Sequence, residues 1–240
     1  GSSKLSLSDN TLSATGSGNN ATNAISMSVT NASKASVGIA SAQSLDGGSS
    51  VTSDTTGSIK MSGGISTDSA LSAADNTIKA TALGNLVTNT LTAAANNYTG
   101  PTSSTVTADH ISVAADFAIA NKQINDSAAA IRATTLGTVQ VAVGDVTGTT
   151  SASSSNSLTG NTLKALAQSN SASNEIKLDV TELRSASAGV ASYQSSEAAV
   201  NASVAPHTGS TSGGLFAVTS GALAEGSITV SANAVSALAG

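Results

Sequence analysis

The chain has 240 residues, a formal net charge of −5, no cysteine and only 10% charged residues. The lack of cysteine excludes a disulfide framework and thiolate-bound metals. Nine scattered Lys and Arg residues argue against a nucleic-acid-binding protein, which needs a basic face. No stretch approaches the roughly 18 apolar residues that a membrane-spanning helix requires.

Small side chains dominate the composition. Aromatic residues make up 2% of the chain, and Ser, Thr, Ala, Asn and Gly fill most positions. A compact globule depends on large apolar side chains, each of which contributes about 1.5–3 kcal/mol when buried. Disorder is disfavoured by a mean hydropathy of +0.12 and by the presence of only two prolines. We therefore expect a thin, repetitive fold with a narrow core.

An internal repeat runs through the chain. Residues 9–29, 75–95 and 160–180 align without a gap, and 5–14 (LSLSDNTLSA) aligns with 228–237 (ITVSANAVSA). We expect one repetitive domain spanning 1–240, with the following units: 5–70, 71–155, 156–227 and the start of a fourth at 228–240. The offset grows from 66 to 80 residues within the second unit, which places an insertion near 96–109.

Alternating apolar residues predict short strands in every unit, in the following segments: 5–7, 25–29, 59–61, 139–141 and 228–230. Gly, Asn, Asp and Ser separate these segments, as is typical of strand ends. The Ala-rich stretches 127–133 and 197–204 resemble helices in composition. They occupy repeat positions that carry the strand pattern elsewhere, so we expect them to be strands.

The predicted architecture is an all-β parallel β-helix, or β-solenoid, built from three imperfect repeats. A unit of about 74 residues is long for one coil, so we expect three coils of about 25 residues per unit and about ten coils in all. Separate β-sandwich domains are the alternative. Their cores usually contain bulkier and more aromatic residues than this chain offers.

The repeated asparagines are expected at corners of the coils, because Asn tolerates left-handed backbone. We expect each side chain to cap its own turn. A continuous ladder of stacked amides is the alternative, disfavoured here because several coils would separate equivalent positions. The repeat-corner residues are Asn10, Asn23, Asn76, Asn89, Asn161, Asn174 and Asn233.

We find no catalytic, cofactor-binding or metal-binding motif, and we expect the protein not to be an enzyme. The two histidines, His110 and His207, are expected in loops. Asp46, Asp126 and Glu197 recur at equivalent repeat positions. We expect a solvated corner there, with a weak Ca²⁺ site as the alternative, because the calcium motif GGxGxD is missing.

The DNTIKATALGNLVTN-type units and the Ser/Thr/Ala/Asn bias resemble bacterial secreted β-helical surface proteins and adhesins, among them the holdfast-anchor proteins of stalked alphaproteobacteria. The resemblance implies an extracellular or cell-surface protein that tethers the cell to an adhesive matrix, with surface polysaccharide as a further partner. It assigns no functional residues.

The ends of a solenoid expose unpaired strand edges, which natural proteins usually protect with charges or prolines. We therefore expect a filament subunit or surface adhesin that assembles with itself, head to tail. The alternatives are a monomeric solenoid that binds glycan or ice, a fragment of a longer repeat adhesin, and a β-helix enzyme such as a polysaccharide lyase. The expected assembly ends are Leu5, Leu7, Leu12, Ile228, Val230 and Val235.

Overall fold

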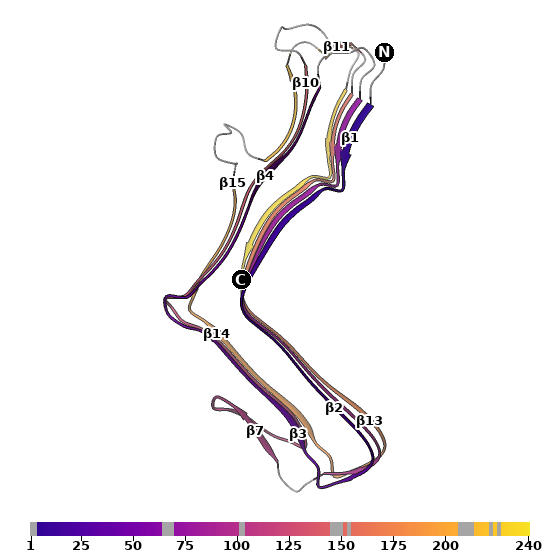
Figure 1. Cartoon of the computed structure of the whole chain (residues 1–240), viewed down its shortest axis with the longest axis vertical. Helices are drawn as coiled ribbons and strands as arrows, with labels where there is room; N and C mark the ends of the chain where they lie inside the picture. Colours follow the sequence, from indigo (N-terminus) through magenta and orange to yellow (C-terminus); the bar gives the residue numbers. More distant parts are fainter. Residues whose placement is uncertain are drawn as a thin grey trace.

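The computed structural model describes residues 4–63, 70–100, 104–144, 151–152, 155–205, 214–220, 223–224 and 227–240. These residues form strands and connecting turns, and none of them is helical. The fold is an all-β solenoid of stacked parallel sheets, as predicted. Each turn is flattened and sharply bent, with two walls that run along the longest axis of the molecule (Figure 1). Successive turns stack along the shortest axis.

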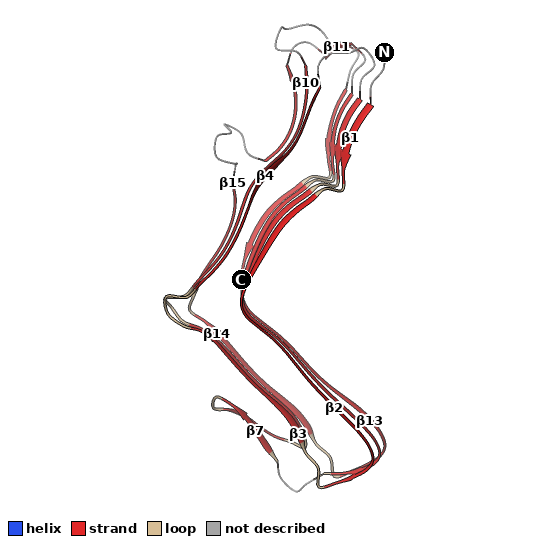
Figure 2. Cartoon of the chain, in the orientation of Figure 1, coloured by secondary structure: helices blue, strands red, loops and turns tan. Residues whose placement is uncertain are grey.

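The first turn shows how the walls are made. Strands β1 (Lys4–Ser8) and β2 (Thr11–Ser33) run along one wall. Strands β3 (Val37–Leu45) and β4 (Ser50–Gly63) return along the other. Figure 2 shows that loops are confined to the bends and to the ends of the walls.

The later turns repeat this order. The second contains β5 (Ala70–Ala74), β6 (Thr77–Thr99), β9 (Phe117–Asn125) and β10 (Ala130–Gly144). The third contains β12 (Ser155–Thr159), β13 (Thr162–Arg184), β14 (Ala188–Ser196), β15 (Ala199–Ala205) and β16 (Gly214–Ser220). The fourth begins with β18 (Ser227–Ser231) and β19 (Ala234–Ala239). The remaining strands are β7 (Thr105–Ala108), β8 (Ile111–Ala114), β11 (Ser151–Ala152) and β17 (Leu223–Ala224).

The strand register shows that one repeat makes one turn. Leu12 pairs with Ile78, Ile78 with Leu163, and Leu163 with Val235. The expectation of about ten coils of about 25 residues is therefore wrong, and the structure has three turns and the start of a fourth. The reason is strand length, since β2, β6 and β13 each contain 23 residues. The Ala-rich stretches are strands, as predicted: 130–144 and 199–205.

A bend within the long strands hides their continuity in the sequence. Along β6 the buried residues are Ile78, Ala80 and Ala82 before the bend, and then Asn85 and Val87 after it. The inward-facing parity therefore switches at Gly84, which is absent from the paired register. A Cβ atom at Gly84 would lie 2.2 Å from the carbonyl oxygen of Ser169, so the close approach of turns here requires glycine.

The core lies between the two walls and is divided at the bend. One part contains Ile78, Val139 and Leu163, and the other contains Leu91, Phe117 and Ile119; all six side chains are fully buried. Many intervening inward positions are Ala, which allows the walls to lie close together. A narrow interior of this kind needs few large side chains, in agreement with the composition.

Tyr98 closes the core at the far end of the second turn. Its ring packs against Phe117 with centroids 4.7 Å apart, and its hydroxyl donates a hydrogen bond to the carbonyl oxygen of Ala35 in the first turn. Burial raises the pKa of Tyr98, and the nearby Asp116 carboxylate raises it further.

The insertion in the second turn is an antiparallel hairpin made of β7 and β8. The register changes between the pairs Ser33–Thr99 and Val37–Phe117, so the insertion lies between 99 and 117, close to the predicted 96–109. Pro101 lies outside the described residues. The hairpin covers the outer face of β9, with β7 against β3 and β8 against β14. It therefore spans all three turns.

We predict that Gly38→Ala displaces this hairpin. The new Cβ atom would lie 2.1 Å from Cγ2 of Val106, so Val106 or the whole hairpin must move, at a cost of about 1–3 kcal/mol. Gly189→Ala is the matched control, because its Cβ atom would meet Ala115 at an ordinary 3.4 Å. Urea unfolding and limited proteolysis of the hairpin measure both effects. Equal behaviour of the two variants would contradict the packing described here.

We also predict that Tyr98→Phe flattens the alkaline pH dependence of stability. Because the pKa of Tyr98 is raised by folding, its contribution is fully present below the ordinary tyrosine pKa of about 10. That contribution is lost as the pH rises through the folded-state pKa. Urea midpoints between about pH 9 and pH 12 should fall more steeply for the wild type than for the variant. Tyr193→Phe removes a tyrosine without touching this corner, and a slope as flat as that of Tyr98→Phe would argue against the assignment.

Candidate assembly surfaces

Four of the repeated asparagines form a ladder at the bend between the first two strands of each turn. Nδ2 of Asn10 donates to Oδ1 of Asn76 at 2.9 Å, Asn76 to Asn161 at 2.9 Å, and Asn161 to Asn233 at 3.0 Å. Each Asn follows a residue with positive φ, between 52° and 69°. These residues are at corners, as predicted. The expected isolated capping is wrong, however, because one repeat per turn brings the four amides into direct contact.

A second ladder joins Asn23, Asn89 and Asn174, with amide–amide distances of 2.8 and 2.7 Å. These three residues lie inside strands β2, β6 and β13 rather than at a chain corner. Their side chains point into the narrow interior just beyond the bend, where Asn89 is fully buried. The repeat alignment located them, whereas their corner placement did not follow.

Two further ladders were not singled out from the sequence. Asn19, Asn85 and Asn170 are joined at 2.7 and 3.0 Å directly after the bend. Gln43, Gln123 and Gln194 are joined at 2.7 and 2.6 Å across the opposite wall. Both sets occupy equivalent positions of the repeat, so recurrence of an amide at one aligned position was the available signal.

The ladders fix the register of the turns. Asn76, Asn89, Asn161 and Gln123 are fully buried, and a buried amide is tolerated only when its polar atoms are paired. Stacking in register supplies those partners from identical side chains one layer away. A shift by one residue would break every ladder and would also turn the apolar residues outward.

The expected assembly ends are the terminal members of interior columns. Leu12 and Val235 flank the fully buried Ile78 and Leu163, and they are 39% and 57% exposed. Leu5 and Ile228 end a second column and are also exposed. In the third column Val230 is exposed and Leu7 is half-buried against the core. The structure thus places all six residues at the two ends of the stack.

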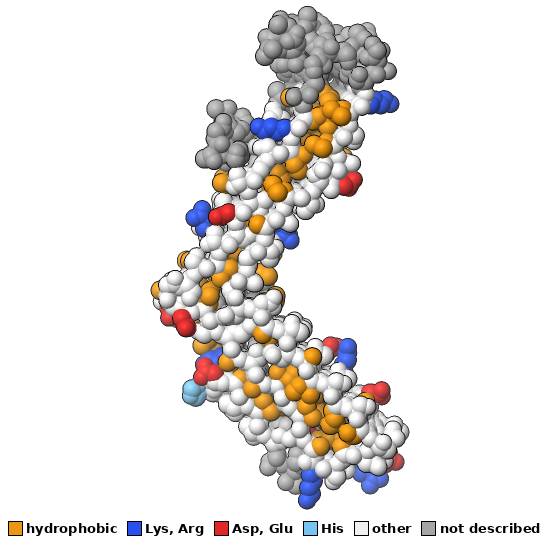
Figure 3. Space-filling view, viewed as in Figure 1, with side chains coloured by type: hydrophobic (Ala, Val, Ile, Leu, Met, Phe, Trp, Pro, Cys, Tyr) orange, Lys and Arg blue, Asp and Glu red, His pale blue; other side chains and the backbone are white. Residues whose placement is uncertain are grey.

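Each end of the stack forms an open face. The N-terminal face is the free edge of β1 to β4, and the C-terminal face is the free edge of β18, β19, β14, β15 and the part of β13 beyond Ala167. Figure 3 shows hydrophobic side chains gathered in stripes along one such face. A hollow of about 440 Å³ opens between β2 and β3 beside Asn23 and Ile25 on the N-terminal face.

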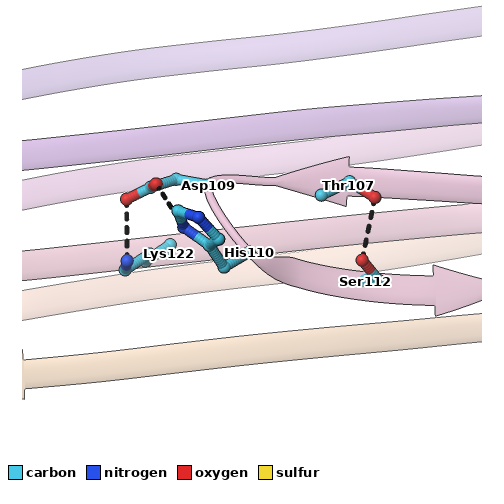
Figure 4. Close-up of polar contacts among 5 residues, drawn as sticks. All are labelled: Thr107, Asp109, His110, Ser112 and Lys122. Carbon is cyan, nitrogen blue, oxygen red and sulfur yellow. Dashed lines mark hydrogen bonds and ion pairs between the residues drawn. The ribbon is translucent and has the colours of Figure 1, made fainter.

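Titratable side chains meet at the tip of the hairpin (Figure 4). Asp109 accepts hydrogen bonds from Nζ of Lys122 at 2.7 Å and pairs with Nδ1 of His110 at 2.9 Å. The bond from Lys122, followed by that from His110, lowers the pKa of Asp109. The hydroxyls of Thr107 and Ser112 lie 2.8 Å apart across the two strands. These contacts hold the hairpin against β9 and bring no nucleophile next to a base.

The recurring acidic residues lie at exposed turns. Asp126 accepts hydrogen bonds from the main-chain N–H of Ala128 and the hydroxyl of Ser127, both at 3.1 Å. The bond from Ala128 is the main cause of its lowered pKa. Asp46 accepts a bond from the Ser44 hydroxyl. Among the described residues, no group of three or more His, Cys, Asp or Glu side chains could hold a metal ion. His207 lies outside the described residues.

No protein-family model, curated protein or solved structure matches the chain. Within the described ranges, no helix is long and apolar enough to cross a membrane. The two open faces are therefore the candidate functional surfaces, because they combine exposed apolar columns, free strand edges and the ends of four amide ladders.

We predict that Asn76→Ala destabilises the fold by about 1–3 kcal/mol, because it removes buried amide bonds on both sides. Asn97→Ala is the control, since Asn97 makes one amide bond to Asn31 on the exposed outer surface. Urea denaturation compares the two variants. A loss of stability as large for Asn97→Ala as for Asn76→Ala would show that buried stacking is not the stabilising feature.

Proposed function

We propose that the protein is a structural, non-enzymatic subunit of an extracellular filament or surface matrix, assembled by stacking copies head to tail. The observation that carries the proposal is that both ends of the solenoid leave their interior columns open. Leu12 and Val235, at opposite ends of one column, are 39% and 57% exposed, whereas the two residues between them are fully buried.

The strand edges support the same function. Strands β2 and β3 form most of one wall and the start of the other on the N-terminal face, and neither contains a charged residue or a proline. Charges and prolines are the devices that commonly prevent edge strands from pairing with other chains. On the C-terminal face, β14, β15, β18 and β19 also lack both. Such edges favour pairing with a further parallel layer.

Contacts between two different faces of identical subunits produce open filaments rather than closed dimers. A filament of this kind needs no cofactor. Its outer surface, rich in Ser, Thr and Asn, would face solvent and suits contact with surface polysaccharide. The placement outside the cell and the adhesive role follow from the resemblance to secreted β-helical surface proteins, and they are part of the proposal.

We predict that the purified protein forms uniform thin filaments in negative-stain electron microscopy as its concentration is raised. Layers of strands should repeat every 4.8 Å or so along the filament axis, and three turns per subunit should give an axial repeat of about 14 Å. Dispersed single particles at every concentration would argue against assembly. They would favour the alternative of a monomeric solenoid that binds glycan or ice.

A further inference from the structure

We infer that the faces join with a single polarity and register, with the C-terminal face of one copy on the N-terminal face of the next. In this arrangement Asn19, Asn23 and Gln43 of the second copy continue the ladders that end at Asn170, Asn174 and Gln194 of the first. This inference rests on the proposed function and adds the orientation, the register and the residues at the junction.

The amide ladders have a direction. In both interior asparagine ladders Nδ2 donates from the first turn towards the third, as from Asn23 to Asn89 and from Asn89 to Asn174. The glutamine ladder runs the opposite way, because Gln194 donates to Gln123 and Gln123 donates to Gln43. The two faces therefore present different atoms of the same amides.

Main-chain carbonyls fix these directions. Nδ2 of Asn19, Asn85 and Asn170 also donates to the carbonyl oxygens of Ser44, Ile124 and Ser195, at 2.6, 3.0 and 2.9 Å. Nε2 of Gln43 and Gln123 donates to the carbonyl oxygens of Leu86 and Ser171, at 2.9 and 3.1 Å. A carbonyl oxygen only accepts, so a flipped amide would lose its main-chain bond.

The unpaired atoms of the two faces are complementary. Within the described part of the chain, the N-terminal face has free acceptors on two amides and a free N–H on a third, on Asn19, Asn23 and Gln43 respectively. The C-terminal face has free N–H groups on two amides and a free acceptor on the third, on Asn170, Asn174 and Gln194 respectively. All three positions match when unlike faces meet.

Like faces do not match in this way. Two N-terminal faces would offer each other mainly amide oxygens, and burial of polar atoms without a partner is unfavourable. Two C-terminal faces would offer mainly N–H groups. The ladder ends therefore disfavour a two-fold dimer and favour a polar filament.

The fourth turn sets a further condition. Strands β18 and β19 already cover β12 and the start of β13, up to Ala167. In the inferred register, residues 4–17 of the second copy arrive at this same layer. The two segments carry the same pattern, with Leu5 equivalent to Ile228 and Leu12 equivalent to Val235. One segment must leave the layer, so joining includes an exchange of equivalent strands.

Another register can be told apart by its spacing. A second copy placed with Asn10 over Asn233 keeps both segments bound, but it leaves one layer unfilled over Asn170, Asn174 and Gln194. Its axial repeat would be about four layers, or 19 Å, against about 14 Å for the inferred register.

The test is Asn174→Asp, measured by the critical concentration for filament formation and by the axial repeat. Asp at this position still accepts the bond from Asn89 within its own subunit. At neutral pH it would place a carboxylate against the Asn23 oxygen of the next copy. We expect the critical concentration to rise about tenfold or more at pH 7. At about pH 3 the protonated carboxyl can donate, and assembly should return to the wild-type level at that pH.

Asn201→Asp is the matched control, since Asn201 is exposed on the outer surface of β15 and the variant carries the same added charge. It should assemble as the wild type does. Asn174→Asp filaments with a wild-type critical concentration at pH 7 would overturn the polarity. Wild-type filaments with a repeat near 19 Å would overturn the register, while leaving the filament itself. Absence of wild-type filaments would overturn the proposed function and the inference with it.

Discussion

The structure depends on one constraint, which is that every repeat closes one turn and so places identical side chains one layer apart. This constraint makes buried amides affordable, because each Asn or Gln finds its partner in the next copy of itself. The chain of bonds from Asn10 through Asn76 and Asn161 to Asn233 continues through all described turns. Unequal repeats keep this register only because the extra residues leave the wall, as the β7–β8 hairpin does.

The same constraint explains the composition. Walls that lie close together leave room for Ala columns such as Ala80 with Ala165, with larger side chains such as Ile78 and Leu163 at the wider positions. Polar ladders separate the two apolar parts of the interior at the bend. The bend itself depends on Gly84, whose position leaves no space for a side chain. Few aromatic residues and few charges are therefore a consequence of this geometry rather than a sign of disorder.

The repeat alignment and the apolar alternation predicted the all-β solenoid, and the aligned offsets equal the observed strand offsets at Leu12, Ile78, Leu163 and Val235. The number of turns could not be predicted in the same way. The parity switch at Gly84 makes one 23-residue strand look like two separate segments, and short segments suggested short coils. The columns that end at Leu5 and Val235 could be anticipated from the repeat, whereas the amide directions could not. Those directions depend on which carbonyl lies beside each amide, as Ser44 does beside Asn19, and the fold alone decides this.

Forces that stack the turns inside one molecule are the same as those available between molecules. Parallel strand edges, apolar columns and amide ladders all continue through a layer without regard to which chain supplies it. Strand edges and apolar columns are only weakly selective, because any parallel layer with small apolar residues satisfies them. The ladders are selective, because an amide presents a donor on one side and an acceptor on the other. Asn174 and Asn23 thus carry the direction of the interior stack out to the two faces, where it can select one orientation of the neighbouring copy.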